Sequence, residues 1–78
     1  MKIKEFTEYL VKSIVSEPDM VKASEFGGED DSIILEVIVC ERDRGCVIGK
    51  SGNIAKAIRT LVQAHAYINN LKQVKINI

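Results

Sequence analysis

The chain has 78 residues, enough for one small domain, and its 46% hydrophobic and 28% charged residues are typical of a globular protein rather than a disordered one. The N-terminal sequence MKIKEFTEYLVKSIV has no uninterrupted apolar run such as a signal peptide or a membrane span requires, so we expect a cytoplasmic location. The net charge of zero is unevenly distributed. Residues 1–43 carry eleven acids and five bases (net −6), whereas residues 44–78 carry six bases and no acid (net +6). A polyanion-binding surface needs such a positive half, although the two halves can also neutralise each other after folding.

An amphipathic helix is expected over residues 3–16, because large apolar residues recur there at helical spacing. The expected core stripe consists of Ile3, Phe6, Leu10 and Ile14. Pro18 follows, and proline disfavours a helical conformation in the residue before it. We therefore expect the helix to end just before Pro18.

Two strands are expected next, over residues 20–26 and 32–40, joined by a turn at the sequence GGEDD, residues 27–31. The second strand, SIILEVIVC, alternates its side chains between two faces. Leu35, Val37 and Val39 are predicted to face the core. Ile34 and Ile38 are predicted to lie on the opposite face, where exposed isoleucines indicate a contact with a partner.

The second half begins with a predicted short helix at 42–48, followed by a glycine-rich loop and a longer helix from Asn53 to about Ile68. Asn53 is a suitable N-cap. The expected apolar stripe of the longer helix consists of Ile54, Ile58, Leu61, Val62 and His65. A turn at residues 69–72 (NNLK) and an alternating strand at 73–78 (QVKINI) complete the chain.

The predicted order of elements is therefore α-β-β-α-α-β. Consecutive strands favour an antiparallel hairpin, and the long connection through two helices permits parallel pairing of the last strand. We expect one α+β domain over residues 1–78, with a three-stranded mixed sheet and three helices on one face. Cys40 and Cys46 are expected to be reduced thiols, and with His65 as the only histidine no metal site or cofactor is predicted.

The glycine-rich loop at residues 45–53, GCVIGKSGN, contains the letters GKS of a nucleotide-binding P-loop. That motif needs four residues between its two glycines, but only three separate Gly45 from Gly49. No acid follows Asp43 to hold magnesium, so we do not expect an NTPase. A glycine-rich turn with a purely structural role remains an alternative, because GxxG alone is a weak signal.

A nucleic-acid clamp explains more of the residues in this loop than a P-loop or a purely structural turn does. Glycines let the backbone approach a ribose-phosphate chain, and the following helix N-terminus favours phosphate. Lys50 adds a positive charge and Ser51 a hydrogen-bond donor. Apolar residues beside the loop can line a groove for unstacked nucleobases. Neighbouring Lys and Arg side chains extend the positive surface. The predicted RNA-binding residues are Arg44, Val47, Ile48, Gly49, Lys50, Ser51, Gly52, Asn53, Ile54, Lys56 and Arg59.

The segment VIGKSGNIAKAI closely resembles the signature of the KH domain, in which a GxxG loop between two helices clamps about four nucleotides of single-stranded RNA. The order of elements matches the type II form found in bacteria. With its length and the segment YLVKSIVSEPDMV, nearly the whole chain resembles the small bacterial proteins made of a single KH domain, the KhpA (YlqC) family.

This resemblance implies that Gly49, Lys50, Ser51 and Gly52 form the clamp. It also implies that four apolar residues lie around and beneath the groove: Val47, Ile48, Ile54 and Ile58. Many KH sequences have Ile or Val where this chain has Ala55, so the groove floor is expected to be shallower, or Ile54 to substitute. The family resemblance further implies homodimers, or pairing with a larger RNA-binding protein that also has a KH domain.

We therefore predict a non-enzymatic module that binds single-stranded RNA with low sequence specificity, as an RNA chaperone or post-transcriptional regulator. The alternative is a protein-interaction adaptor that keeps the fold and acts mainly by dimerisation with another RNA-binding protein. Four aromatic residues are expected to be core or interface residues rather than stacking platforms, because none adjoins the loop: Phe6, Tyr9, Phe26 and Tyr67.

Overall fold

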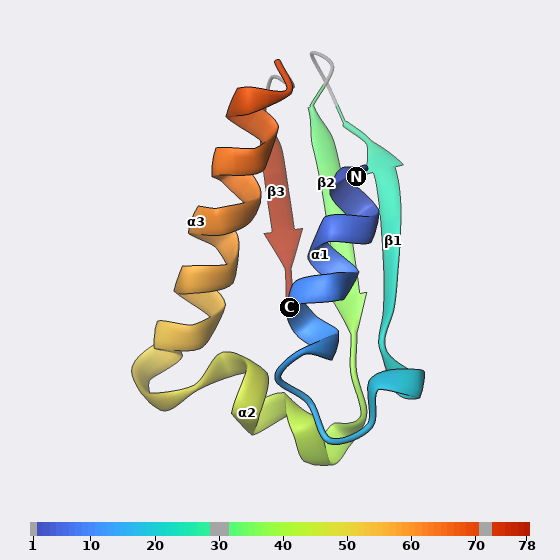
Figure 1. The fold of residues 1–78 in the computed structure, drawn as a ribbon, viewed down its shortest axis with the longest axis vertical. Coiled ribbons are helices and arrows are strands. Elements are labelled where there is room, and N and C mark those ends of the chain that lie inside the picture. The colour runs from blue at the N-terminus through green and yellow to red at the C-terminus, as the bar shows by residue number, and fades with distance from the viewer. Residues whose placement is uncertain (1, 29–31, 71–72) are drawn as a thin grey trace.

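The computed structural model describes residues 2–28, 32–70 and 73–78 (Figure 1). These described residues form three α-helices and three strands in the predicted order α-β-β-α-α-β. These are α1 (Ile3–Lys12), β1 (Lys22–Gly27), β2 (Ile33–Ile38), α2 (Arg44–Ile48), α3 (Asn53–Ile68) and β3 (Val74–Asn77). Short 3₁₀ turns at Pro18–Met20 and Glu41–Asp43 precede β1 and α2.

The three strands form one mixed sheet with β2 in the centre. β1 pairs with β2 in antiparallel orientation, with Ala23 opposite Val37, and β3 pairs with β2 in parallel, with Leu35 opposite Ile76. The helices cover one side of this sheet (Figure 1). The α+β fold, the hairpin and the parallel return after two helices are therefore confirmed.

The core lies between the helices and the inner face of the sheet. Its fully buried side chains are Leu35, Val11, Val47, Val62 and Thr7. The alternation predicted for the second strand is confirmed, since Leu35 and Val37 are buried while Ile38 is 61% exposed on the outer face. Within the described part of the chain, no helix is long and apolar enough to span a membrane.

Helix α1 differs from its prediction in both its end and its buried face. It ends at Lys12 rather than residue 16, and the chain beyond it is held by the carboxylate of Asp43, as described below. Ile3 is buried as predicted, but the other buried residues, Thr7 and Val11, each lie one position after the predicted Phe6 and Leu10, which are only half-buried. Thr7 can occupy the core because its hydroxyl donates a 2.8 Å hydrogen bond to the carbonyl of Ile3.

Helix α3 begins and ends as predicted, but Asn53 is not its N-cap. Gly52 occupies the cap position in a left-handed conformation (φ 74°, ψ 13°), and no side chain caps this end. The buried face consists of Ala55, Ile58, Val62 and Ala66. Two residues of the predicted stripe lie outside this face, since Ile54 is 37% exposed and Leu61 49%.

The strands are also shifted slightly from their predicted limits. The first begins at Lys22 rather than residue 20, because residues 18–20 form a 3₁₀ turn. The second spans 33–38 rather than 32–40. The predicted turns at 27–31 and 69–72 lie partly outside the described residues, at positions 29–31 and 71–72.

Candidate nucleic-acid interface

The glycine-rich loop joins the end of α2 at Ile48 to the start of α3 at Asn53. Gly49 has φ 74° and ψ 177°, a region that is essentially restricted to glycine. A β-carbon placed on Gly49 would lie 2.6 Å from Cγ1 of Ile54, so the loop backbone packs directly against the first turn of α3. The loop is closed by a 3.2 Å hydrogen bond from the Gly52 amide to the Gly49 carbonyl.

Ser51 also has a left-handed conformation, with φ 58° and ψ 26°. A left-handed conformation is strained for a residue with a side chain, and such strained residues cluster at ligand clamps. Ser51 is exposed, beside the uncapped N-terminus of α3. The first amide groups of a helix have no partner within the helix and favour an anion. The loop can therefore offer backbone and hydroxyl donors to a phosphate without an intervening side chain at Gly49 or Gly52.

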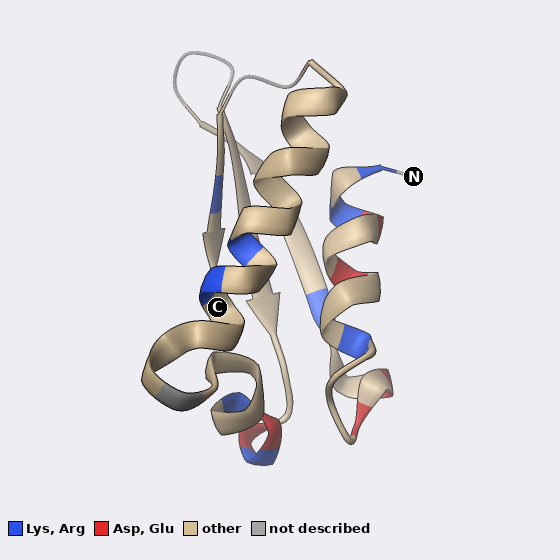
Figure 2. Cartoon of the chain, turned by 60° about the vertical axis from the view of Figure 1, so that its left-hand side comes forward, with Lys and Arg blue, Asp and Glu red and all other residues tan. Residues whose placement is uncertain are grey.

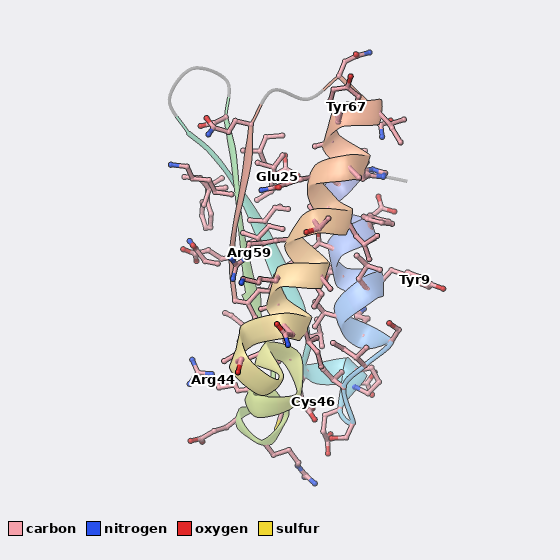
Figure 3. All side chains as sticks on the ribbon, turned by 90° about the vertical axis from the view of Figure 1, so that its left-hand side faces the viewer. Tyr9, Glu25, Arg44, Cys46, Arg59 and Tyr67 are labelled. Atoms are coloured by element: carbon pink, nitrogen blue, oxygen red, sulfur yellow. The ribbon has the colours of Figure 1, made fainter. Side chains whose placement is uncertain are left out.

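A cavity of about 460 Å³ lies between α3 and β3. Its apolar lining comes from Ala66, Val74 and Ile76, and its polar lining from Arg59, Gln63, Tyr67, Gln73 and Lys75. Of these, sequence reasoning had selected only Arg59. The spacing of four residues from Arg59 to Gln63 to Tyr67 was the available signal, because residues four apart share one side of a helix. Figure 3 shows Arg59 partway along α3 and Tyr67 near its end.

A second cavity, of about 530 Å³, lies between α2 and the C-terminal ends of β2 and β3. It is lined by Val37, Ile38, Val39, Glu41, Arg44, Ile48 and Ile78. Two of the predicted site residues, Arg44 and Ile48, are therefore at this cavity, and Ile48 is 44% exposed. Its lining is mainly apolar, with one acid and one base.

The charged side chains of α2, α3 and β3, the elements around the two cavities, are all positive. Residues 44–78 contain no acid, so α2, α3 and β3 contribute only Lys and Arg as charged side chains. Figure 2 shows the basic segments of α3 and β3 beside each other, while α1 carries both acidic and basic segments. Arg44, Lys56, Arg59 and Lys75 are all exposed. The sequence asymmetry is therefore also an asymmetry in space.

The predicted site residues do not all have the predicted positions. Val47 is fully buried, so we correct its role from lining the groove to supporting α2 beneath it. Ile54 is partly exposed and packs against Gly49, and Asn53 is exposed in the first turn of α3. Lys56 is exposed but lines neither cavity.

Of the two locations expected for the aromatic residues, the core and an interface, the core does not apply to the two tyrosines. Tyr67 is 84% exposed and Tyr9 62%, so neither belongs to the core. His65 is half-buried, and its ring stacks on Phe6 with a centroid distance of 4.5 Å and an interplanar angle of 11°. This contact joins α1 to α3 and confirms the prediction that His65 is a packing residue.

The position of α2 depends on the buried carboxylate of Asp43, which sequence reasoning missed. Asp43 accepts hydrogen bonds from the Ser16 hydroxyl (2.7 Å), the Ser16 amide (3.0 Å) and the Glu17 amide (3.1 Å). These bonds, the one from the Ser16 hydroxyl above all, hold the pKa of Asp43 below its ordinary value of 3.8. The carboxylate thus joins the turn before α2 to the chain leaving α1.

A GxxG loop between two helices, in an α-β-β-α-α-β fold with a mixed three-stranded sheet, defines a type II KH domain. The family model described as "KhpA/KhpB, KH domain" matches residues 4–78, and the chain belongs to this family.

Several curated relatives are called "RNA-binding protein KhpA". The one from Clostridium perfringens is 51% identical over 72 residues, which cover 92% of this chain and 95% of the relative. The one from Clostridium acetobutylicum is 50% identical with the same coverage. The one from Borreliella burgdorferi is 47% identical over 66 residues, 85% of this chain and 79% of the relative. No solved structure matches the chain.

Proposed function

We propose that this chain binds single-stranded RNA, with the phosphate backbone held at residues 49–52 and the bases directed into the groove beside α3. The observation that carries the proposal is the loop backbone, in which Gly49 packs on Ile54 and the strained Ser51 is exposed beside an uncapped helix N-terminus. This arrangement brings free donors close to a phosphate.

The edge of the sheet supports the same proposal. In the parallel pair, Ile33 donates its amide hydrogen to the carbonyl of Gln73 at 2.7 Å, so the backbone of Val74 and Ile76 is turned away from β2. Both residues line the α3–β3 cavity. Their free N–H and C=O groups can therefore form hydrogen bonds with base edges, while the apolar lining contacts the faces of unstacked bases.

The name of the relatives, "RNA-binding protein KhpA", agrees with this assignment. One KH domain over residues 1–78 reads few bases, so we propose low sequence specificity and the role of a cytoplasmic, non-enzymatic RNA chaperone or post-transcriptional regulator. The basic half of the chain is the expected surface for the RNA backbone.

The double variant Lys50→Asp, Ser51→Asp tests the clamp. It should lose mobility shift with single-stranded RNA at low salt while keeping its far-ultraviolet circular dichroism. The chain supplies a matched control, because Lys12 and Ser13 form the same dipeptide at the exposed end of α1. Lys12→Asp, Ser13→Asp changes the charge equally and should bind RNA normally. Normal RNA binding by the loop variant would show that the clamp is wrongly assigned.

A second candidate role, association with another KH domain, is favoured by the solvent-facing side of α3. An apolar stripe follows the spacing of three and four residues along the whole helix: Ile54, Ala57, Leu61, Ala64 and Ile68. All five residues are exposed. The stripe lies roughly 140° around the helix from Arg59, Gln63 and Tyr67, so a partner bound there leaves the groove open.

The arrangement of large and small residues along this stripe is compatible with packing against the same helix of a second copy in antiparallel orientation. Ile54 and Ile68 lie seven residues to either side of Leu61, and alanines lie between them. A two-fold axis at Leu61 would place Ile54 opposite Ile68 of the other copy, as a self-complementary interface requires. The alanines allow the helices to approach closely. We therefore propose a homodimer through α3, or a heterodimer in which the KH domain of a larger RNA-binding protein occupies the same surface.

Leu61→Asp tests this association. In sedimentation velocity at increasing protein concentration, the wild-type chain should move from monomer to dimer, and the variant should remain at the monomer mass of 8.7 kDa. Thr60→Asp is the control, because it adds the same charge at the adjacent exposed position outside the stripe. A wild-type chain that forms a stable protein complex but shifts no RNA would favour the adaptor role over RNA binding.

A further inference from the structure

Tyr67 has an unusual position for an aromatic side chain. It is 84% exposed, the largest exposed fraction among the large hydrophobic residues that the structure describes. Yet it lines the cavity between α3 and β3 together with Arg59, Gln63 and Lys75. Tyr67 therefore borders a concave surface, while most of its side chain remains in water.

The residues beside Tyr67 form a continuous polar ridge. Arg59, Gln63 and Tyr67 follow one another at four-residue intervals on α3, and Lys75 lies across the cavity on β3. The ridge begins with a guanidinium group that can contact phosphate and ends with an aromatic ring. Base–aromatic stacking tolerates any base, because every base has a π-face.

The distance from the loop determines which nucleotide Tyr67 can meet. Tyr67 follows Asn53 by fourteen residues, a rise of roughly 21 Å along the helix axis at 1.5 Å per residue. A GxxG loop clamps about four nucleotides beside itself. An RNA held at residues 49–52 must therefore extend beyond its first four nucleotides to place a base on Tyr67.

We propose that Tyr67 is a base-stacking platform that lengthens the RNA site beyond the four nucleotides held by the clamp and groove. The proposal rests on the proposed RNA binding. The ring stacks on the next base, Lys75 contacts the adjoining phosphate, and Gln63 lies between this platform and Arg59. Specificity remains low at this position, while the preferred length of RNA increases.

Binding of oligouridylate four and eight nucleotides long tests the proposal. Tyr67→Ala should weaken binding of the octamer by about five- to tenfold, the lower part of the range for loss of one base–aromatic stack, and leave the tetramer unchanged. Tyr67→Phe should bind both lengths like wild type. Tyr9→Ala is the matched control, since Tyr9 is 62% exposed on α1 and does not line the cavity.

Tyrosine fluorescence gives a second readout in which Tyr67 itself is unchanged, so a structural effect of replacing Tyr67 cannot produce the signal. The chain has two tyrosines and no tryptophan, so in Tyr9→Phe all tyrosine emission comes from Tyr67. Addition of the octamer should quench this emission, and the tetramer should not. The proposal that Tyr67 is a stacking platform would be overturned by unchanged emission when the octamer is bound. It would also be overturned if Tyr67→Ala lost affinity equally for the tetramer and the octamer.

Failure of the platform and failure of the clamp are distinguishable. If Lys50→Asp, Ser51→Asp retains normal binding of both oligomers, the clamp at residues 49–52 is wrong, and the Tyr67 quenching still decides whether this ring stacks on RNA. If Tyr67→Ala binds the octamer normally but weakens a protein complex, Tyr67 is a protein contact and the platform is rejected.

Discussion

Gly49 and Ile54 are in such close contact that a single added β-carbon on the glycine would lie 2.6 Å from Cγ1 and 2.8 Å from Cβ of the isoleucine. The end of α2 and the first turn of α3 therefore share one packing contact across the loop. The positive φ of Gly49 and this contact act together, because a side chain would be strained by the backbone angle and excluded by the neighbour. The conformation at Gly49 is therefore restricted both by its backbone angles and by its contact with Ile54.

The two glycines with positive φ should differ in their response to alanine. Gly49→Ala should lower the free energy of unfolding by about 3 kcal/mol or more, because backbone strain and overpacking both contribute. Gly52→Ala should cost only about 1–2 kcal/mol, because nothing lies within 4 Å of its β-carbon and only the left-handed conformation is penalised. Urea unfolding followed by circular dichroism measures both.

The same contact predicts a non-additive pair. Ile54→Ala should recover part of the loss in Gly49→Ala, because it removes the atoms with which the new β-carbon overlaps. The coupling measured in the double-mutant cycle should be favourable. Strictly additive effects would show that the loop relaxes away from α3 and that the close packing does not determine its shape.

Stability should also depend on the ionisation of Asp43. Its pKa is lower in the folded chain than its ordinary value of 3.8, so the charged form is favoured by folding. The stabilisation is present above pH 3.8 and is lost as the pH falls through the lower, folded pKa. Asp43→Asn should therefore lower the melting temperature at pH 7, and its difference from wild type should shrink with acidification below pH 4.

The matched control for Asp43→Asn is Glu41→Gln, because Glu41 is an exposed acid in the same turn. It should leave the pH dependence of melting almost unchanged. If the difference between Asp43→Asn and wild type is the same at pH 3 and pH 7, the carboxylate contributes nothing through its ionised form.

Sequence periodicity predicted the extent of α3 and the alternation of β2 well, because both segments contain many apolar residues at regular spacing. It was partly wrong on α1 for two reasons, one local and one long-range. Thr7 counts as polar in a periodic pattern, but its hydroxyl is satisfied by the Ile3 carbonyl four residues earlier, so it can be buried. The chain beyond the helix end is held by Asp43, which lies 27 residues beyond Ser16 and which no local pattern reveals.

The candidate site was also only partly predictable. The loop and the basic residues that flank it lie within one short segment, so a sequence motif can identify them. The cavity between α3 and β3 could not be predicted without the parallel crossover, because Lys75 and Arg59 line one cavity only when β3 lies beside β2. Val47 and Ile48 are adjacent apolar residues that the sequence alone could not distinguish. In the structure Val47 is fully buried, whereas Ile48 is exposed.

Ala55 occupies a position where many KH sequences have a larger apolar residue, and here it is 5% exposed. Ala55→Leu should destabilise the domain by about 1–3 kcal/mol, because extra methylene groups force shifts in a packed core. Thr60→Leu, at an exposed position of the same helix, should change stability by about 0.5 kcal/mol or less. Increased stability of Ala55→Leu would instead reveal unfilled space beneath the groove.

The salt dependence of RNA binding should separate phosphate contacts from other basic residues. Log K should fall linearly with log salt concentration, and each phosphate contact to single-stranded RNA contributes about −0.7 to the slope. Arg59→Ala should reduce the magnitude of this slope by about 0.7, because Arg59 lines the α3–β3 cavity. Arg42→Ala is the control, because Arg42 lies 3.2 Å from Glu17 in a surface ion pair and lines neither cavity. Equal slopes for wild type and Arg59→Ala would place the RNA backbone away from α3, whereas a reduced slope in Arg59→Ala alone would place it along the ridge that leads to Tyr67.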